Sequence, residues 1–136
     1  MTRDGALLLG LVVVVALAVA TGSGPTTTAK KKLTRAQLVA LARDAGFPEA
    51  EVEHAADIAM RESGGNPSAV LDTRGRTDLP KGQLPENSIG LWQINLLAWP
   101  EFSRAELLNA KGNARAALKI WKRAGWAPWS THRPDE

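Results

Sequence analysis

Apolar residues recur at helical spacing along most of the chain from residue 33 onward. The first stretch opens with Thr34 and Gln37, which form the pattern of a capping box, and it ends at Gly46. Leu33 stands where a hydrophobic staple would pack against the first turn. Four apolar residues share one face of this predicted helix: Leu38, Leu41, Ala42 and Ala45.

A second helical pattern follows Pro48, a residue tolerated in the first turn of a helix, and it ends at Gly64. The residues on its apolar side are mostly small: Val52, Ala55, Ala56, Ala59 and Met60. This helix is therefore predicted to pack closely at the centre of the domain. Glu62 follows Ile58 by four residues, so its side chain is predicted to lie along a partly apolar face at the helix end.

Residues 65–88 show no helical period and are interrupted by several glycines and prolines. A stretch of this length inside a small domain is typical of a functional loop or of a short β-hairpin. Beyond it, the apolar residues from Ile89 to Leu97 predict a short helix, and Ser103 with Glu106 predicts the cap of another.

The final helical pattern runs from about Gly112 to Ala124 and ends at Gly125. Four residues are predicted to point inward: Ala114, Ala117, Leu118 and Trp121. The charged positions fall on the opposite face: Arg115, Lys119, Lys122 and Arg123. Asn109 and Asn113, near the start of this pattern, fit the roles of helix caps and of ligand contacts equally well.

Residues 126–132 follow as an aromatic tail that is predicted to be irregular. The predicted fold class is therefore mainly α, as one small helical domain. A short β-hairpin in the 65–88 loop is left open.

The N-terminal segment has a different pattern. Residues 5–20 form an apolar run without any charge, and as a helix they would span roughly 24 Å, less than the ~30 Å hydrocarbon core of a bilayer. The small residues at Ala18 and Ala20 fit a signal-peptidase site and predict cleavage after Ala20; a short uncleaved membrane anchor is the alternative. Residues 21–32 predict a flexible linker, which leaves 33–136 as the single domain.

Composition narrows the function classes. The chain of 136 residues has no cysteine, which excludes disulfides, cysteine nucleophiles and most zinc sites, and we expect neither a cofactor nor a metal. The formal net charge is +3, without a concentrated basic face, and the aromatic residues do not interleave with the cations, so a nucleic-acid binder is disfavoured.

Two short stretches carry the candidate chemistry: the one from Glu62 to Pro67, which reads E-S-G-G-N-P, and the one from Ser88 to Asn95, which reads S-I-G-L-W-Q-I-N. A glutamate at a helix end, followed by a G-x-x-Q-I-N turn, resembles the active-site signature of the lysozyme-like superfamily. The soluble lytic transglycosylase-type domain, found in bacteria and phages, is the most similar branch. Its members cut the glycan strands of peptidoglycan.

The resemblance implies a role for each matching residue. Glu62 matches the single catalytic glutamate, and its apolar helical neighbours favour the protonated form that a general acid needs. Ser63 matches the serine that helps to hold this carboxylate. Four residues match the S-x-G-L-x-Q signature, in which the glycine lets the sugar approach the backbone and the glutamine lines the groove: Ser88, Gly90, Leu91 and Gln93.

Ser88 also bears on the mechanism. Animal lysozymes of the same superfamily carry their second catalytic aspartate at this place. With one carboxylate, the resemblance implies that the N-acetyl group of the substrate assists cleavage and that a 1,6-anhydro end forms without water. Glu86, two residues before Ser88, is the alternative that could restore a hydrolytic pair.

The sequence departs from this family in lacking tyrosine, which many of these enzymes carry in the groove. Tryptophan stacks well on sugar rings, and Trp129 is predicted to line the groove instead. Trp92 and Trp121 are predicted to lie in the core. Trp126 and His132 are further alternatives, with His132 more typical of an exposed tail.

The resemblance implies that the partner is the peptidoglycan glycan strand and that the domain acts as a monomer. It places the protein in the cell wall, the periplasm or outside the cell, either exported or anchored through residues 5–20, and a phage virion also stays open. The same fold could serve as a non-catalytic wall-binding or assembly module. Glu62 favours an enzyme, because a binding module has no use for a half-buried acid.

Overall fold

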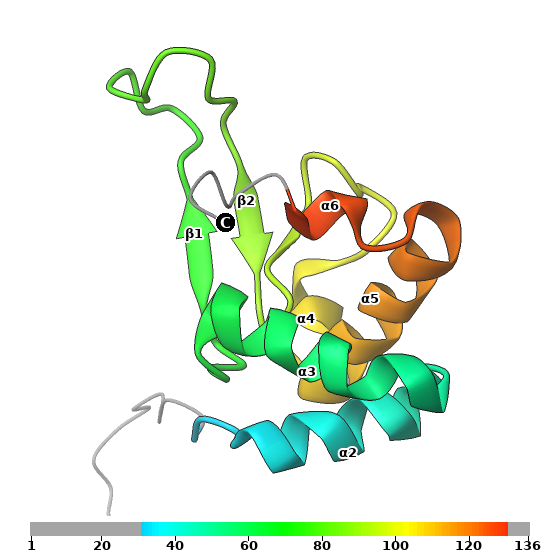
Figure 1. Cartoon of the computed structure of the whole chain (residues 1–136). Helices are drawn as coiled ribbons and strands as arrows, with labels where there is room; N and C mark the ends of the chain where they lie inside the picture. The colour runs from blue at the N-terminus through cyan, green and yellow to red at the C-terminus, as the bar shows by residue number, and fades with distance from the viewer. Residues whose placement is uncertain (1–30, 131–136) are drawn as a thin grey trace, which may run out of the picture.

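The computed structural model describes residues 31–130. The predicted signal peptide or anchor, most of the linker, and His132 lie outside these residues. The described part holds five helices: α2 (Arg35–Ala45), α3 (Glu49–Ser63), α4 (Arg104–Leu107), α5 (Ala110–Ala124) and α6 (Ala127–Ser130). It also holds an antiparallel sheet of three strands: β1 (Val70–Asp72), β2 (Asn87–Ile89) and β3 (Ile94–Asn95). This mainly helical fold with a small sheet confirms the predicted fold class (Figure 1).

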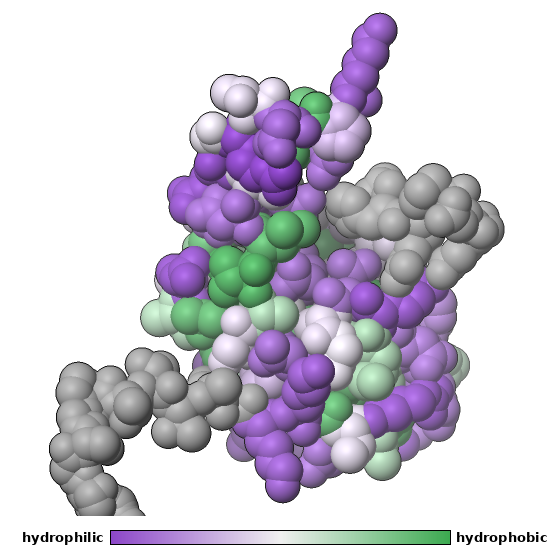
Figure 2. All heavy atoms as spheres, turned by 90° about the vertical axis from the view of Figure 1, so that its left-hand side faces the viewer, coloured by the Kyte–Doolittle hydropathy of each residue, from purple (hydrophilic) through white to green (hydrophobic). Residues whose placement is uncertain are grey.

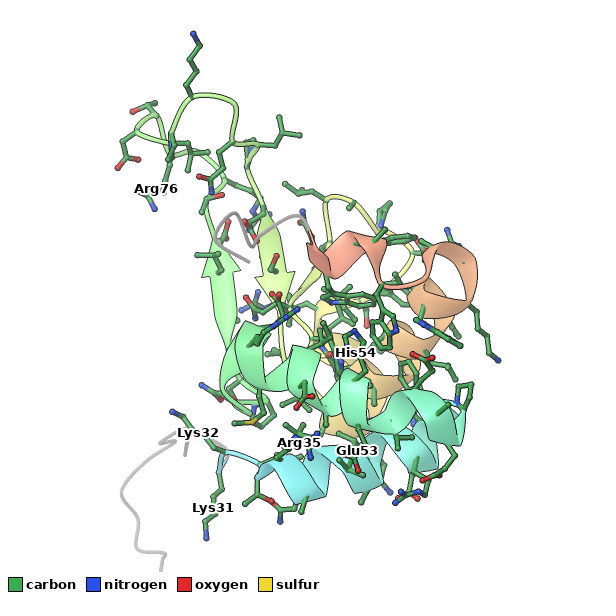
Figure 3. The ribbon with its side chains drawn as sticks, viewed as in Figure 1. Lys31, Lys32, Arg35, Glu53, His54 and Arg76 are labelled. Atoms are coloured by element: carbon green, nitrogen blue, oxygen red, sulfur yellow. The ribbon has the colours of Figure 1, made fainter. Side chains whose placement is uncertain are left out.

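Helices α2 and α3 form where the capping signals predict them. The Thr34 hydroxyl accepts a hydrogen bond from the Gln37 N–H at 3.1 Å, and the Gln37 side chain accepts one from the Thr34 N–H at 2.8 Å. The two helices pack side by side in Figure 1. Arg35 on α2 reaches across to Asp57 at 2.7 Å and to Glu53 at 2.8 Å, as Figure 3 shows for Arg35 and Glu53. Because these ion pairs are exposed, they contribute little, and the apolar contact between α2 and α3 holds the two helices together.

The buried side of α3 differs from the predicted stripe at one residue. The buried residues of this helix are Val52, Ala55, Ala56, Ile58 and Ala59. The prediction for Met60 is wrong, because its side chain is 38% exposed. Helical spacing puts Met60 beyond Ala56, at the edge of the buried face, whereas Ile58 lies on the other edge and is covered.

The predicted helix from Ile89 to Leu97 is wrong. Strand β2 ends at Ile89, residues 90–93 form a turn, and β3 pairs back on β2 with Ser88 opposite Asn95. Gly90 and Gln93 both have positive φ, +79° and +48°, which an α-helix does not accommodate. A short apolar run does not distinguish a helix from a strand by its spacing, and here the turn geometry decides.

Helix α5 begins two residues earlier than predicted because Asn109 caps it, accepting a hydrogen bond from the Gly112 N–H at 2.9 Å. Asn113 is fully buried. Its side chain accepts a hydrogen bond from the Trp92 N–H at 2.9 Å and donates to the carbonyls of Ile89 at 2.9 Å and Leu107 at 2.8 Å. Asn113 therefore fixes the 90–93 turn onto α5.

The C-terminal tail is more regular than predicted, since residues 127–130 form the one-turn helix α6. Trp92 is fully buried, which confirms its prediction, and its indole N–H donates to the Ala55 carbonyl at 3.0 Å. Trp121 is half-buried and packs against Phe47.

The hairpin stands out from the helices. The loop between β1 and β2 extends away from the rest of the domain in Figure 1, and all three residues of β1 are exposed. Figure 2 shows an apolar patch on this side of the molecule, where the exposed apolar residues of β1 are Val70 and Leu71. No helix within residues 31–130 has the length and apolar character needed to cross a bilayer.

Candidate active site

A cleft of about 850 Å³ opens between the helices and the hairpin. Its walls come from the end of α3, the 80–86 loop, strand β2, the 93–99 segment and helices α5 and α6. The end of α3, the stretch of residues 80–99 and the C-terminal helices are far apart in the sequence, and the fold brings them together around one hollow. Three charged residues line the cleft in the described part of the chain: Glu62, Lys81 and Glu86.

Glu62 enters the cleft from the last turn of α3. The next residues end the helix: Ser63 donates its hydroxyl hydrogen bond to the Ala59 carbonyl at 2.9 Å, and Gly64 adopts the left-handed conformation at φ +64°. The Glu62 side chain is half-buried, with the apolar Ile94 and Ile120 on the cleft wall. A half-buried carboxyl group at the edge of a hollow can give a proton to a ligand that fills it.

Ser63 does not line the cleft. Its hydroxyl also accepts a hydrogen bond from the Gly65 N–H at 3.2 Å, so both bonds are spent within the helix end. A side chain on Gly65 would overlap the Leu33 carbonyl oxygen. The E-S-G-G stretch therefore forms the chain reversal that places Glu62 at the cleft. Ser63 stabilises this reversal through its two hydrogen bonds to the backbone.

The second motif splits between cleft and core. Ser88 and Gln93 line the cleft, but Leu91 is fully buried and cannot touch a ligand. Gly90 is buried as well, and a Cβ there would overlap the Asn113 side chain and the Leu107 carbonyl oxygen. Gly90 therefore allows α5 to approach the backbone closely, whereas the sequence predicted that it would allow a sugar to do so.

Gln93 holds the cleft wall together. Its side-chain amide donates to the carbonyl oxygens of Ala69 at 3.1 Å and Gly90 at 3.0 Å, which ties the turn to the start of β1. Because this amide nitrogen is occupied, the side-chain oxygen is the group of Gln93 that can serve a ligand.

Glu86 is a second carboxylate in the cleft. The Ser88 hydroxyl donates to the Glu86 carboxylate at 2.6 Å, and both side chains line the hollow. The two other carboxylates on the hairpin, Asp72 and Asp78, pair with Arg74 and Arg76 and do not line it. The hydrogen bonds from Arg74 lower the pKa of the Asp72 carboxyl to about 2.

The aromatic wall differs from the expectation. Trp129 borders the cleft but is only 4% exposed, and its indole N–H donates to the Trp92 carbonyl at 2.8 Å. Trp121 and Trp126 do not line the cleft; they pack with Phe47 behind its wall, where the Trp126 ring lies 5.4 Å from the Trp129 ring.

The sequence reasoning missed Trp99. This side chain is half-buried on the cleft wall, and the Arg123 guanidinium lies 4.9 Å from its ring centre. Its place four residues after Asn95, the end of the second motif, was the only signal in the sequence, and the cleft position itself comes from the fold.

A family model described as a lysozyme-like domain matches residues 39–131. The matched range includes both motif stretches, the hairpin and every segment that lines the cleft. Comparison with individual curated proteins gave no significant match.

Proposed function

The chain belongs to the lysozyme-like domain family, and from this premise we propose that it cleaves the β-1,4 bond between N-acetylmuramic acid and N-acetylglucosamine in peptidoglycan. Proteins of this family are generally peptidoglycan-cleaving enzymes, so action on peptidoglycan follows from membership. The observation that carries the finer proposal is the position of Glu62, half-buried at the end of α3 and on the wall of a cleft of about 850 Å³. A cleft of this volume accommodates several sugar units.

In the proposed reaction, Glu62 gives its proton to the glycosidic oxygen as the bond to the muramyl C1 breaks, and the bonding electrons stay with that oxygen. The carbonyl oxygen of the muramyl 2-acetamido group attacks C1 and forms a cyclic oxazolinium ion. The Glu62 carboxylate then takes the proton of the muramyl 6-hydroxyl. Attack of O6 on C1 opens the oxazolinium ring, restores the acetamide and leaves a 1,6-anhydro end without consuming water.

Hydrolysis by a muramidase is the second candidate, and Glu86 favours it. A second carboxylate on the same cleft could activate water in place of the 6-hydroxyl. Both candidates use Glu62 as the acid and differ in what captures C1.

The released glycans distinguish the two reactions. We expect mass spectrometry of the muropeptides to show ends lighter by one water than reducing ends, and reducing-sugar assays to report little product. Mostly reducing ends would refute the transglycosylase reaction and leave the muramidase.

Trp99 is proposed to stack on a sugar ring. Trp99→Ala is expected to raise the KM for glycan strands by about fivefold to tenfold with little change in kcat, because stacking serves bound substrate and transition state alike. Trp99→Phe, which keeps an aromatic face, is the matched control and should restore most of the affinity. An unchanged KM in Trp99→Ala would remove this residue from the substrate site.

Peptidoglycan lies outside the cytoplasmic membrane, so this function requires export. The apolar run of residues 5–20 is proposed to supply it as a signal peptide or as an anchor.

A further inference from the structure

Glu86 lies outside the helix-end motif and outside the S-I-G-L-W-Q-I-N stretch, yet it shares the cleft with Glu62. These are the two carboxylates that line the cleft among residues 31–130. The remaining charged residue on the wall, Lys81, belongs to the exposed 80–85 part of the loop. Because Glu62 is proposed as the proton donor, Glu86 is the carboxylate of this cleft that is available for a second role.

The hairpin fixes the position of Glu86. The Thr73 hydroxyl accepts a hydrogen bond from the Glu86 N–H at 2.8 Å, and the Thr73 N–H donates to the Glu86 carbonyl at 2.8 Å. Thr73 itself is only 2% exposed. The side chain and the backbone of Thr73 therefore both hold the backbone of Glu86, at the base of the projecting loop.

The side chain of Glu86 is oriented as well. Glu86 and Ser88 are two residues apart, and side chains at this spacing point to the same side of an extended chain. The Ser88 hydroxyl, buried to 2% exposure, donates to one carboxylate oxygen at 2.6 Å. This distance is in the range for O–H···O⁻ hydrogen bonds to a charged acceptor. Ser88 thus occupies one oxygen and leaves the other able to meet a ligand.

We propose that Glu86 is a second catalytic carboxylate that accepts the N–H of the muramyl 2-acetamido group and stabilises the oxazolinium ion. In this ion the positive charge is shared between the ring oxygen and nitrogen of the former acetamide, and its N–H becomes a strong donor. A fixed carboxylate at that N–H favours the cation over the neutral ground state, which is the differential stabilisation that raises kcat. The inference rests on the proposed cleavage of the glycan strand.

The first test is kinetic. Glu86→Gln keeps the size of the side chain and a partner for Ser88 but removes the charge, so kcat should fall about thirtyfold or more while KM stays within about threefold. Glu86→Ala should be equally slow and should regain activity with added formate, which supplies a small carboxylate. A merely structural role for Glu86 would not respond to formate.

The second test measures binding without turnover. The probe is a 2-acetamido iminosugar, which is positively charged at neutral pH, and the neutral comparison ligand is the trisaccharide of N-acetylglucosamine. Measured by calorimetry, Glu86→Gln should lower the affinity for the iminosugar at least about tenfold and leave the affinity for the trisaccharide within about twofold of the parent value. Asp78→Asn is the matched control, because Asp78 lies on the same hairpin and does not line the cleft. It pairs with Arg76, which Figure 3 labels on the projecting loop. This control should match the parent in both tests.

The outcomes separate this inference from the proposed function. If the parent cleaves peptidoglycan and Glu86→Gln keeps kcat within about threefold, the inference is overturned and the function stands. A shift of the products from reducing to anhydro ends in Glu86→Gln would also overturn it, because Glu86 would then be a base for water. A parent protein that leaves peptidoglycan intact would overturn both.

Discussion

Replacement of Glu62 by glutamine is expected to lower peptidoglycan turnover at least about a hundredfold while the protein stays folded. Glutamine keeps the size of the side chain but has no proton of suitable acidity to give. The expected loss is larger than for any other cleft residue, because without the acid the leaving oxygen must depart as an alkoxide. Release of soluble muropeptides from purified peptidoglycan, measured at several protein concentrations, gives the rate.

A matched control lies on the same helix. Glu53→Gln removes an exposed carboxylate that pairs with Arg35, and exposed pairs of this kind contribute little, so activity and melting temperature should stay near those of the parent. Melting curves of Glu62→Gln and the parent should superimpose. Digestion by Glu62→Gln at the parental rate would show that Glu62 is not the acid, and Glu86 would then be the first residue to test.

Local signals explain why the glutamate could be predicted. The Thr34–Gln37 capping box and the glycines after each helix act within a few residues, and the structure has both helix ends where these signals predict them. The position of Glu62 at the end of α3 depends only on the stop at Gly64. Its placement on a cleft depends on distant segments, which the helical pattern alone does not describe.

The structure of the second motif, residues 88–95, is harder to predict from the sequence, because long-range contacts determine its conformation. The apolar residues from Ile89 to Leu97 fit a helix or a strand equally well. Gln93 has a positive φ, and glutamine is not a residue type from which a positive φ would be predicted. The placement of Trp99 follows from how the chain leaves this turn. Glu86 could be named as a candidate from its spacing to Ser88, but its clamp by Thr73 depends on the pairing of β1 with β2.

Asn113 shows the same limit, since a buried asparagine and a helix cap look alike in sequence. Asn109 is the cap, with one hydrogen bond to the Gly112 N–H. Asn113 makes three hydrogen bonds to backbone groups of the 89–92 segment and of Leu107, and it is fully buried. Gly90 fits against it, because a Cβ at Gly90 would overlap its amide nitrogen.

Asn113→Ala is therefore expected to destabilise the domain by about 3 to 5 kcal/mol, because it leaves one buried N–H and two carbonyls without this partner and opens a cavity. For a domain of this size, the melting temperature should fall by about 15 °C or more. Urea unfolding followed by tryptophan fluorescence would report the free energy through the midpoint, with an unchanged slope if both proteins unfold in one step.

Asn109→Ala is the matched control on the same helix, and loss of its cap should cost only about 1 kcal/mol. Since Asn113 fixes the 90–93 turn, which carries Gln93 to the cleft, the surviving folded fraction of Asn113→Ala should also bind glycan more weakly than the control. Equal stability losses in the two variants would mean that the turn holds its shape without Asn113. In that case the packing of Gly90 and Trp92 alone would position the second half of the cleft.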